Sequence, residues 1–326
     1  MVKKIKNRLN LLNILNLFNL AVNLLKCLAV LLLVSCAAKT TQKPTPLPST
    51  GTSATTVGSE TIKTSPIEVE SPTAPYVTTP TPPSVSMPTR SLPKVGLIFS
   101  GGGAKAWAHI GFIKEIEKAK WPVHAVAGFE WGAVVAAVYA NNFSSNEVEW
   151  ELSKVKDFEN IEETSHNLFD KKSVNDLKIP FVCPSLNISK QMIYLLNRGQ
   201  LSKLIPYCLA QPPLSKPYAH SVAEMHDLSS LAQHLRATGA NKIILINVLS
   251  QSTKRSFTND YLSAENILWS KSAALMAKKI SGVDDVVNIN LDDFALDDIN
   301  NKREIIAKGA QLSYDSVKKL TRKYGL

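Results

Sequence analysis

The sequence has no uninterrupted apolar run that is long enough to span a membrane. The first 35 residues are largely apolar, but asparagines interrupt them repeatedly and Lys26 divides them. The only clean apolar block covers residues 27–35, which is too short to cross a bilayer. A membrane-spanning helix is therefore disfavoured, and an uncleaved N-terminal anchor stays open as the alternative to a cleaved signal.

Charge of one sign and clusters of metal ligands are also scarce. The chain carries a formal charge of +10, but residues 1–35 hold five basic and no acidic residues, so the rest is only +5. That excess is too weak to indicate nucleic-acid binding. His226 and His234 have no Cys or Asp at ligand spacing, which disfavours a metal site. We expect no nucleic-acid partner, no metal and no cofactor.

The N-terminus has the pattern of a bacterial lipoprotein signal. Four basic residues precede the apolar stretch, which ends in the sequence Leu-Val-Ser-Cys at Cys36. A peptidase would remove residues 1–35 as a signal peptide, and the thiol of Cys36 would carry the lipid. Ala37, and not Asp, follows this cysteine. In this respect the sequence resembles bacterial lipoproteins that are sorted to the outer membrane. We expect a lipid-anchored protein of the bacterial cell envelope.

Residues 36–93 are predicted to be the lipidated cysteine and a disordered tether. Residues 37–93 contain 11 of the 18 prolines, are otherwise mostly Ser, Thr and small residues, and show no apolar period. Such a segment buries too little apolar surface to offset its ordering entropy. The folded domain is therefore predicted to be 94–326.

The two cysteines of this domain leave two alternatives open. Cys183 and Cys208 either pair in an oxidising periplasm or remain separate buried thiols, because sequence spacing does not determine the geometry of a disulfide.

The domain alternates apolar strand patterns with helical patterns. This alternation predicts parallel strand pairing and an α/β sheet with helices on both faces. The predicted strands are 94–99, 123–127, 181–186, 191–196, 242–249 and 283–291, and the predicted helices are 104–119, 131–140, 201–210, 227–237, 265–280 and 300–324.

Two glycine motifs lie at the first two strand-to-helix turns. Gly101, Gly102 and Gly103 follow the first predicted strand, and consecutive backbone N–H groups before a helix form an anion site. The second turn reads Gly-Phe-Glu-Trp-Gly, with Gly128 and Gly132 on either side of Glu130. A G-x-x-x-G turn of this kind is typical of an elbow that presents its central residue.

The segments LIFSGGGAKAWAHIGFIKEIEKA and VHAVAGFEWGAVVAAVYA together resemble the patatin-like phospholipase family. The resemblance covers about residues 94–324 and implies a three-layer α/β/α sheet of mostly parallel strands. It implies that the glycine loop, with Lys105 after it, forms an oxyanion hole, and that the elbow carries a serine nucleophile. It also implies an Asp-Gly motif downstream, whose Asp is the base.

Both catalytic positions depart from the family pattern. Glu130 stands where the serine is expected, and no other G-x-S-x-G and no Asp-Gly pair occur in the chain. The base position falls on His220 or Ser221, with one residue of doubt in the register. We hypothesise that Glu130 fills the oxyanion site, with His220 as its partner, in an inactive protein that binds a lipid or an envelope protein. An active lipid acyl hydrolase with altered catalytic residues is the alternative, and a tethered structural scaffold is a third interpretation.

Other conspicuous side chains have ordinary explanations. His109 is predicted to be a packing or capping residue. Trp107, Trp121 and Trp131 are expected in the core, with an aromatic lid over the pocket as the alternative. Four aspartates between 292 and 298 are most simply a solvated loop.

Overall fold

The computed structural model describes residues 92–249 and 264–326. The chain divides into two units, Met1–Pro83 and Ser84–Leu326, and all described residues belong to the second. The predicted signal peptide, Cys36 and nearly all of the tether lie outside the described residues. No helix within the described ranges is long and apolar enough to cross a membrane.

The first half of the domain follows the predicted strand–loop–helix pattern. Its elements are β1 (Val95–Phe99), the 3-10 helix η1 (Gly103–Trp107), α2 (Ala108–Lys118), β2 (Val123–Gly128), α3 (Trp131–Asn142), α4 (Ser145–Ser153), α5 (Ile161–Phe169) and η2 (Val174–Asp176). The predicted helix 104–119 is divided, because its first turn is a 3-10 helix. Helices α4 and α5 were not predicted.

The second half completes the sheet and covers it. Its elements are β3 (Phe181–Asn187), β4 (Met192–Leu196), α6 (Leu201–Leu209), β5 (Ser221–Ala223), α7 (Leu228–Ala237), β6 (Lys242–Asn247), α8 (Ala264–Met276), β7 (Asp285–Asn288), η3 (Ile299–Asn301) and α9 (Lys302–Tyr324). The short strand β5 was not predicted, because three residues carry too little pattern.

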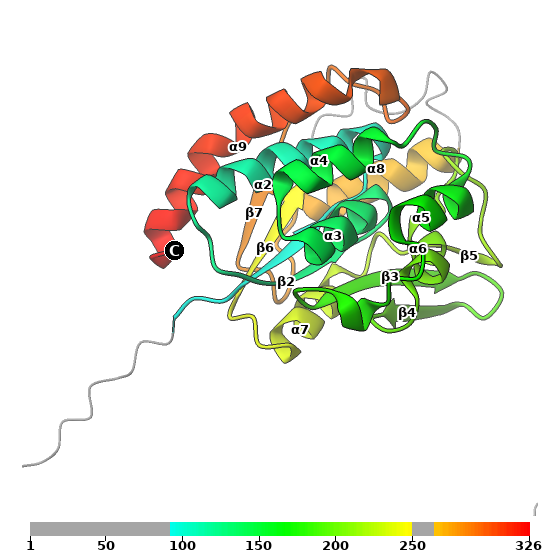
Figure 1. Cartoon of the computed structure of the whole chain (residues 1–326), viewed down its shortest axis with the longest axis horizontal. Helices are drawn as coiled ribbons and strands as arrows, with labels where there is room; N and C mark the ends of the chain where they lie inside the picture. The colour runs from blue at the N-terminus through cyan, green and yellow to red at the C-terminus, as the bar shows by residue number, and fades with distance from the viewer. Residues whose placement is uncertain (1–91, 250–263) are drawn as a thin grey trace, which may run out of the picture. The chain divides into compact units, whose positions relative to one another are not determined.

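The sheet is mostly parallel, as predicted. Its strand order is β4-β3-β2-β1-β6-β7, and β5 pairs with β3 off this path (Figure 1). The strands β3, β2, β1, β6 and β7 run parallel, and only β4 and β5 pair antiparallel with β3. The central strand β1 is buried at all five positions, which explains its unbroken apolar sequence.

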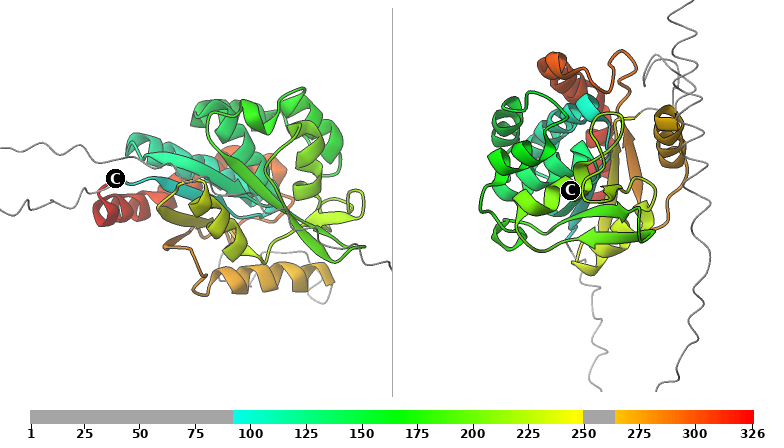
Figure 2. Two further views of the ribbon diagram at one scale, coloured as in Figure 1. Left: turned by 90° about the horizontal axis from the view of Figure 1, so that it is seen from below. Right: turned by 90° about the vertical axis from the view of Figure 1, so that its right-hand side faces the viewer.

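Helices cover both faces of the sheet. Figure 2 shows α7 and α8 on the opposite side of the sheet from α3 and α4. Helix α9 runs along α2 and closes the α3 side of the domain. The fold is therefore the three-layer α/β/α arrangement that the sequence predicts.

A disulfide decides between the two alternatives left open for the cysteines. Cys183 in β3 and Cys208 in α6 are both fully buried, and their sulfur atoms are joined with a Cα–Cα distance of 6.0 Å. The bond ties α6 to the strand beside β2. It therefore supports the region where β2 turns into α3.

Candidate functional site

The elbow lies between the end of β2 and the start of α3. Glu130 is its central residue, with φ 52° and ψ −135°. Residues other than glycine rarely adopt this backbone conformation. The backbone N–H of Glu130 donates to the carbonyl of Cys208 at 2.9 Å. The disulfide-bonded end of α6 therefore holds the elbow in this strained conformation.

Gly132, on the C-terminal side of the elbow, lies very close to the end of β1. A Cβ atom on Gly132 would overlap the carbonyl oxygens of Phe99 and Ser100, at the end of β1. Only glycine lets α3 begin directly against this strand. The elbow is thus pressed against the glycine loop that follows β1.

The glycine loop binds the side chain of Glu130. The backbone N–H groups of Gly102 and Gly103 donate to its Oε2 atom at 2.8 Å and 3.0 Å. Two convergent amides before a helix are the donors that would stabilise a developing oxyanion. Glu130 Oε2 therefore occupies the place at which these amides would meet a substrate oxygen.

Burial makes the protonation of this carboxyl group sensitive to pH near neutrality. Glu130 is fully buried, and its Oε1 atom has no hydrogen-bond partner among the described residues. Burial raises the pKa of Glu130 to about 7, although the backbone amides of Gly102, Trp131 and Gly103 oppose the rise by stabilising the anion. The group is therefore partly protonated at neutral pH.

Apolar side chains cover the loop from the other side. A Cβ atom on Gly103 would lie 2.7 Å from Leu214 Cδ1, and one on Gly102 would lie 3.0 Å from Val248 Cγ2. The backbone N–H of Ala104 donates to the carbonyl of Leu296 at 2.6 Å. None of five cavities found in the described part of the chain is lined by Glu130 or by the three glycines.

The residues at the predicted base position do not reach Glu130. His220 is exposed and has a left-handed φ of 61°, and among the described residues only its backbone carbonyl is bonded, to the N–H of Ile188. Ser221 is buried at the start of β5, where its Oγ accepts from Asn187 Nδ2 at 3.4 Å. The hypothesis that His220 is the partner of Glu130 is therefore wrong, because β5 pairs with β3 and leaves His220 facing solvent.

Comparison with known proteins agrees with this geometry. A sequence model of the family described as patatin-like phospholipase matches residues 97–241, which include the glycine loop, the elbow and the base segment. This match confirms the predicted resemblance to the patatin-like phospholipase family over these residues.

The curated relatives are much longer proteins. Patatin-like phospholipase domain-containing protein 6 from Homo sapiens and from Mus musculus is 27% identical over 205 residues, which are 54% of this chain and 15% of each relative. The neuropathy target esterase sws of Drosophila melanogaster is 28% identical over 54% of this chain and 14% of its own length. The chain thus matches about one seventh of these relatives.

Two solved structures show weaker similarity. The type III effector protein ExoU has a TM-score of 0.37 and 12% identity, over 70% of this chain and 53% of ExoU. VipD from Legionella pneumophila has a TM-score of 0.39 and 9% identity, over 69% of this chain and 66% of VipD. At these TM-scores the two similarities add nothing to the family assignment.

The basic residue of the patatin-like glycine loop is buried without a hydrogen bond. Lys105 is fully buried, and its Nζ atom has no hydrogen-bond partner among the described residues. Burial lowers the pKa of Lys105 to about 8, and the charge of Asp292 opposes this change. Asp292 is half-buried, so the interpretation of the four aspartates as a solvated loop does not hold for this one.

His109 and the tryptophans are core residues. Burial lowers the pKa of His109 to about 4, and the neutral ring donates from Nε2 to the carbonyl of Ser100 at 2.8 Å. The rings of Trp107 and Trp131 lie 5.3 Å apart beside the elbow. Trp121 lies elsewhere, because its indole N–H donates to Thr321 in α9.

One polar cluster carries no motif in the sequence. His226 Nε2 lies 3.2 Å from Ser272 Oγ, and His226 Nδ1 lies 3.5 Å from Glu224 Oε1. Burial disfavours the Glu224 anion, but hydrogen bonds from His226 and Asp227 outweigh it and lower the pKa of Glu224. Ser272 is fully buried in α8, and none of the five cavities reaches this cluster. Within the described ranges, no group of His, Cys, Asp and Glu has the arrangement of a metal site.

Proposed function

We propose that this chain is a lipid-anchored patatin-like protein that acts by binding and does not hydrolyse esters. The observation that carries the proposal is the contact of Glu130 Oε2 with the amides of Gly102 and Gly103. A substrate carbonyl needs these two donors to stabilise its tetrahedral oxyanion, and the side chain at the nucleophile position already uses them.

The base segment supports the same proposal. No hydrogen bond among the described residues joins His220 or Ser221 to Glu130, so neither is placed to activate a nucleophile or a water molecule there. A carboxylate nucleophile would form a mixed anhydride with the acyl group, and its hydrolysis would again require a base. The fold is therefore retained while both chemical groups of the dyad are replaced.

The proposed location is the bacterial envelope, where a lipid attached to Cys36 anchors the protein in the outer membrane. The basic and apolar N-terminus and the sequence Leu-Val-Ser-Cys support it. The disulfide between Cys183 and Cys208 is compatible with an oxidising compartment. The proposed ligand is a lipid or another envelope protein. Incorporation of radiolabelled palmitate tests the anchor, and Cys36→Ser is expected to abolish the labelling.

Hydrolase assays test the proposed inactivity. The unmodified protein and Glu130→Ser are compared with p-nitrophenyl butyrate and with a fluorescent phosphatidylcholine. Neither protein is expected to exceed the rate of Glu130→Ala, the matched control without an oxygen at this position. Restoring the serine alone fails because its base is missing. Turnover by the unmodified protein above this control contradicts the proposal.

An active hydrolase with altered residues is the second candidate. It is favoured by the complete burial of Glu130 at the elbow, which raises the pKa of its carboxyl group to about 7 and so suits proton exchange at neutral pH. This candidate requires ester hydrolysis that Glu130→Ala abolishes and that follows the ionisation of Glu130. Equal rates for the two proteins exclude it.

A further inference from the structure

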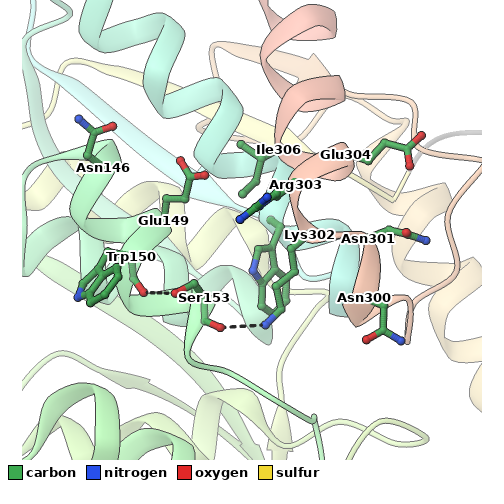
Figure 3. Close-up of a pocket in the computed structure, with 11 residues that line it drawn as sticks. Asn146, Glu149, Trp150, Ser153, Asn300, Asn301, Lys302, Arg303, Glu304 and Ile306 are labelled. Atoms are coloured by element: carbon green, nitrogen blue, oxygen red, sulfur yellow. Dashed lines mark hydrogen bonds between the residues drawn. The ribbon is translucent and has the colours of Figure 1, made fainter.

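A second site lies between α4 and the beginning of α9, away from the elbow. Its cavity has a volume of about 830 Å³, which is within the range of small-molecule sites. Figure 3 shows Asn146, Glu149 and Trp150 on one side of it and Arg303 and Ile306 on the other. The two walls come from helices that are far apart in the sequence.

One residue of the cavity lining has a buried hydrogen-bond donor without a partner. Trp107 lines the cavity and is 1% exposed, and its indole N–H has no partner among the described residues. Buried polar groups are nearly always hydrogen-bonded, so an acceptor that reached this donor would be bound by it. Trp107 belongs to the turn that follows the glycine loop, but the cavity does not include Glu130.

Lys302 links the start of α9 to the end of α4 through hydrogen bonds, so its ammonium group is not available to a ligand. Its Nζ atom donates to the carbonyls of Ser153 and Val155 at the end of α4, and lies 5.5 Å from the centre of the Trp107 ring. Glu149 is likewise engaged, because Lys114 Nζ lies 2.5 Å from its Oε2. These contacts hold the cavity open and neutralise one of its carboxylates.

Four polar side chains of the cavity make no hydrogen bond or ion pair with any described residue. They are two carboxamides, one guanidinium and one carboxylate, from Asn146, Asn300, Arg303 and Glu304. Their charges sum to zero, so the cavity does not select an anion or a cation. Beside them, Trp150 is 64% exposed, and its ring has Lys154 Nζ 5.5 Å away on one face.

We propose that this cavity binds a neutral saccharide. A sugar ring offers an apolar face of C–H groups, which packs against an exposed indole, and hydroxyl groups at its edge. Each hydroxyl both donates and accepts, as a carboxamide does, while the guanidinium only donates and the carboxylate only accepts. Because Glu130 is not part of this cavity, the inference does not depend on whether the elbow is active.

Ligand-observed saturation-transfer NMR tests this site on the full chain, purified in a detergent without a sugar headgroup. The probes are maltotriose, cellotriose and chitotriose, with glycerol 3-phosphate as an anionic probe. At least one trisaccharide is expected to bind saturably. Trp150→Ala is expected to weaken that binding at least about tenfold, because the stacking surface is lost.

Tyr314→Ala is the matched control, since Tyr314 is an exposed aromatic residue of α9 that does not line the cavity. It is expected to leave saccharide binding unchanged. The proposal is overturned if no trisaccharide binds, if only glycerol 3-phosphate binds, or if Trp150→Ala binds as tightly as the unmodified protein. A circular dichroism spectrum identical to that of the unmodified protein confirms that each variant is folded.

Discussion

The elbow and the base segment were both parts of one dyad in the family pattern, but they differ in how the fold constrains them. At the elbow, Glu130 is fully buried, its N–H is bonded to Cys208, and Gly132 touches the end of β1. In the base segment, His220 is exposed, and its one hydrogen bond to another described residue is made by its backbone carbonyl. The backbone of the first region is held by packing, whereas the side chain of His220 in the second is not.

This difference separates the features that packing requires from those that packing leaves free. Gly103, Gly128 and Gly132 cannot be exchanged without moving the backbone, because a Cβ atom there would lie 2.1–2.4 Å from a backbone carbonyl oxygen. The identity of the side chain at position 130 is less restricted than that of these glycines. A carboxyl group there accepts hydrogen bonds from the two loop amides, so they are satisfied without any substrate. An intact elbow is therefore evidence for the fold and does not by itself show catalysis.

The largest effect is expected from Gly132→Ala. The added Cβ overlaps the carbonyl oxygens of Phe99 and Ser100, so α3 and β1 must separate, at a cost of about 3 kcal/mol in the free energy of unfolding. Urea denaturation of the variant and the unmodified protein measures the difference. A loss below about 1 kcal/mol, the scale of an ordinary surface change, would show that the elbow is not held by packing.

An effect of similar size is expected from Glu130→Gln, through the pH dependence of stability. Burial raises the pKa of Glu130 from its ordinary value of 4.5 to about 7 in the folded protein. Between these values the folded state binds more protons than the unfolded state, so stability falls as pH rises, by about 3 kcal/mol in total. Above this window the contribution of Glu130 no longer changes.

The glutamine variant keeps an oxygen for the two amides but does not titrate, so this part of the slope should vanish. Urea denaturation of both proteins at about pH 5 and about pH 8 measures it, and the unmodified protein should lose more stability between the two. Identical slopes for the two proteins would mean that Glu130 ionises at its ordinary pKa and that the loop amides fully compensate its burial.

The smallest effect is expected from His220→Gly. The imidazole is exposed, and glycine adopts the left-handed φ of 61° without strain, while it adds entropy to the unfolded chain. These contributions oppose each other, and the free energy of unfolding should change by no more than about 0.5 kcal/mol. A loss above about 2 kcal/mol would show that the base segment is as constrained as the elbow.

The main elements of the fold and the position of the loop and elbow follow from local sequence patterns. Unbroken apolar runs at β1 and β6 predict buried parallel strands, and the structure has them paired side by side. Gly101–Gly103 and the G-x-x-x-G turn mark two backbone conformations that few other residues permit. In contrast, α4, α5 and β5 were missed, because α4 and α5 have only nine residues each, of which three are buried, and β5 has only three residues.

By itself, the sequence determined the architecture, the family resemblance and the loss of both residues of the dyad, because each depends on residue identity and local spacing. Only the tertiary structure decided how Glu130 is bound, that His220 lies apart from it, that Cys183 and Cys208 are joined, and that a cavity separates α4 from α9. Those features depend on distances between residues that are remote in the sequence, and such distances are fixed by how strands pair and helices pack.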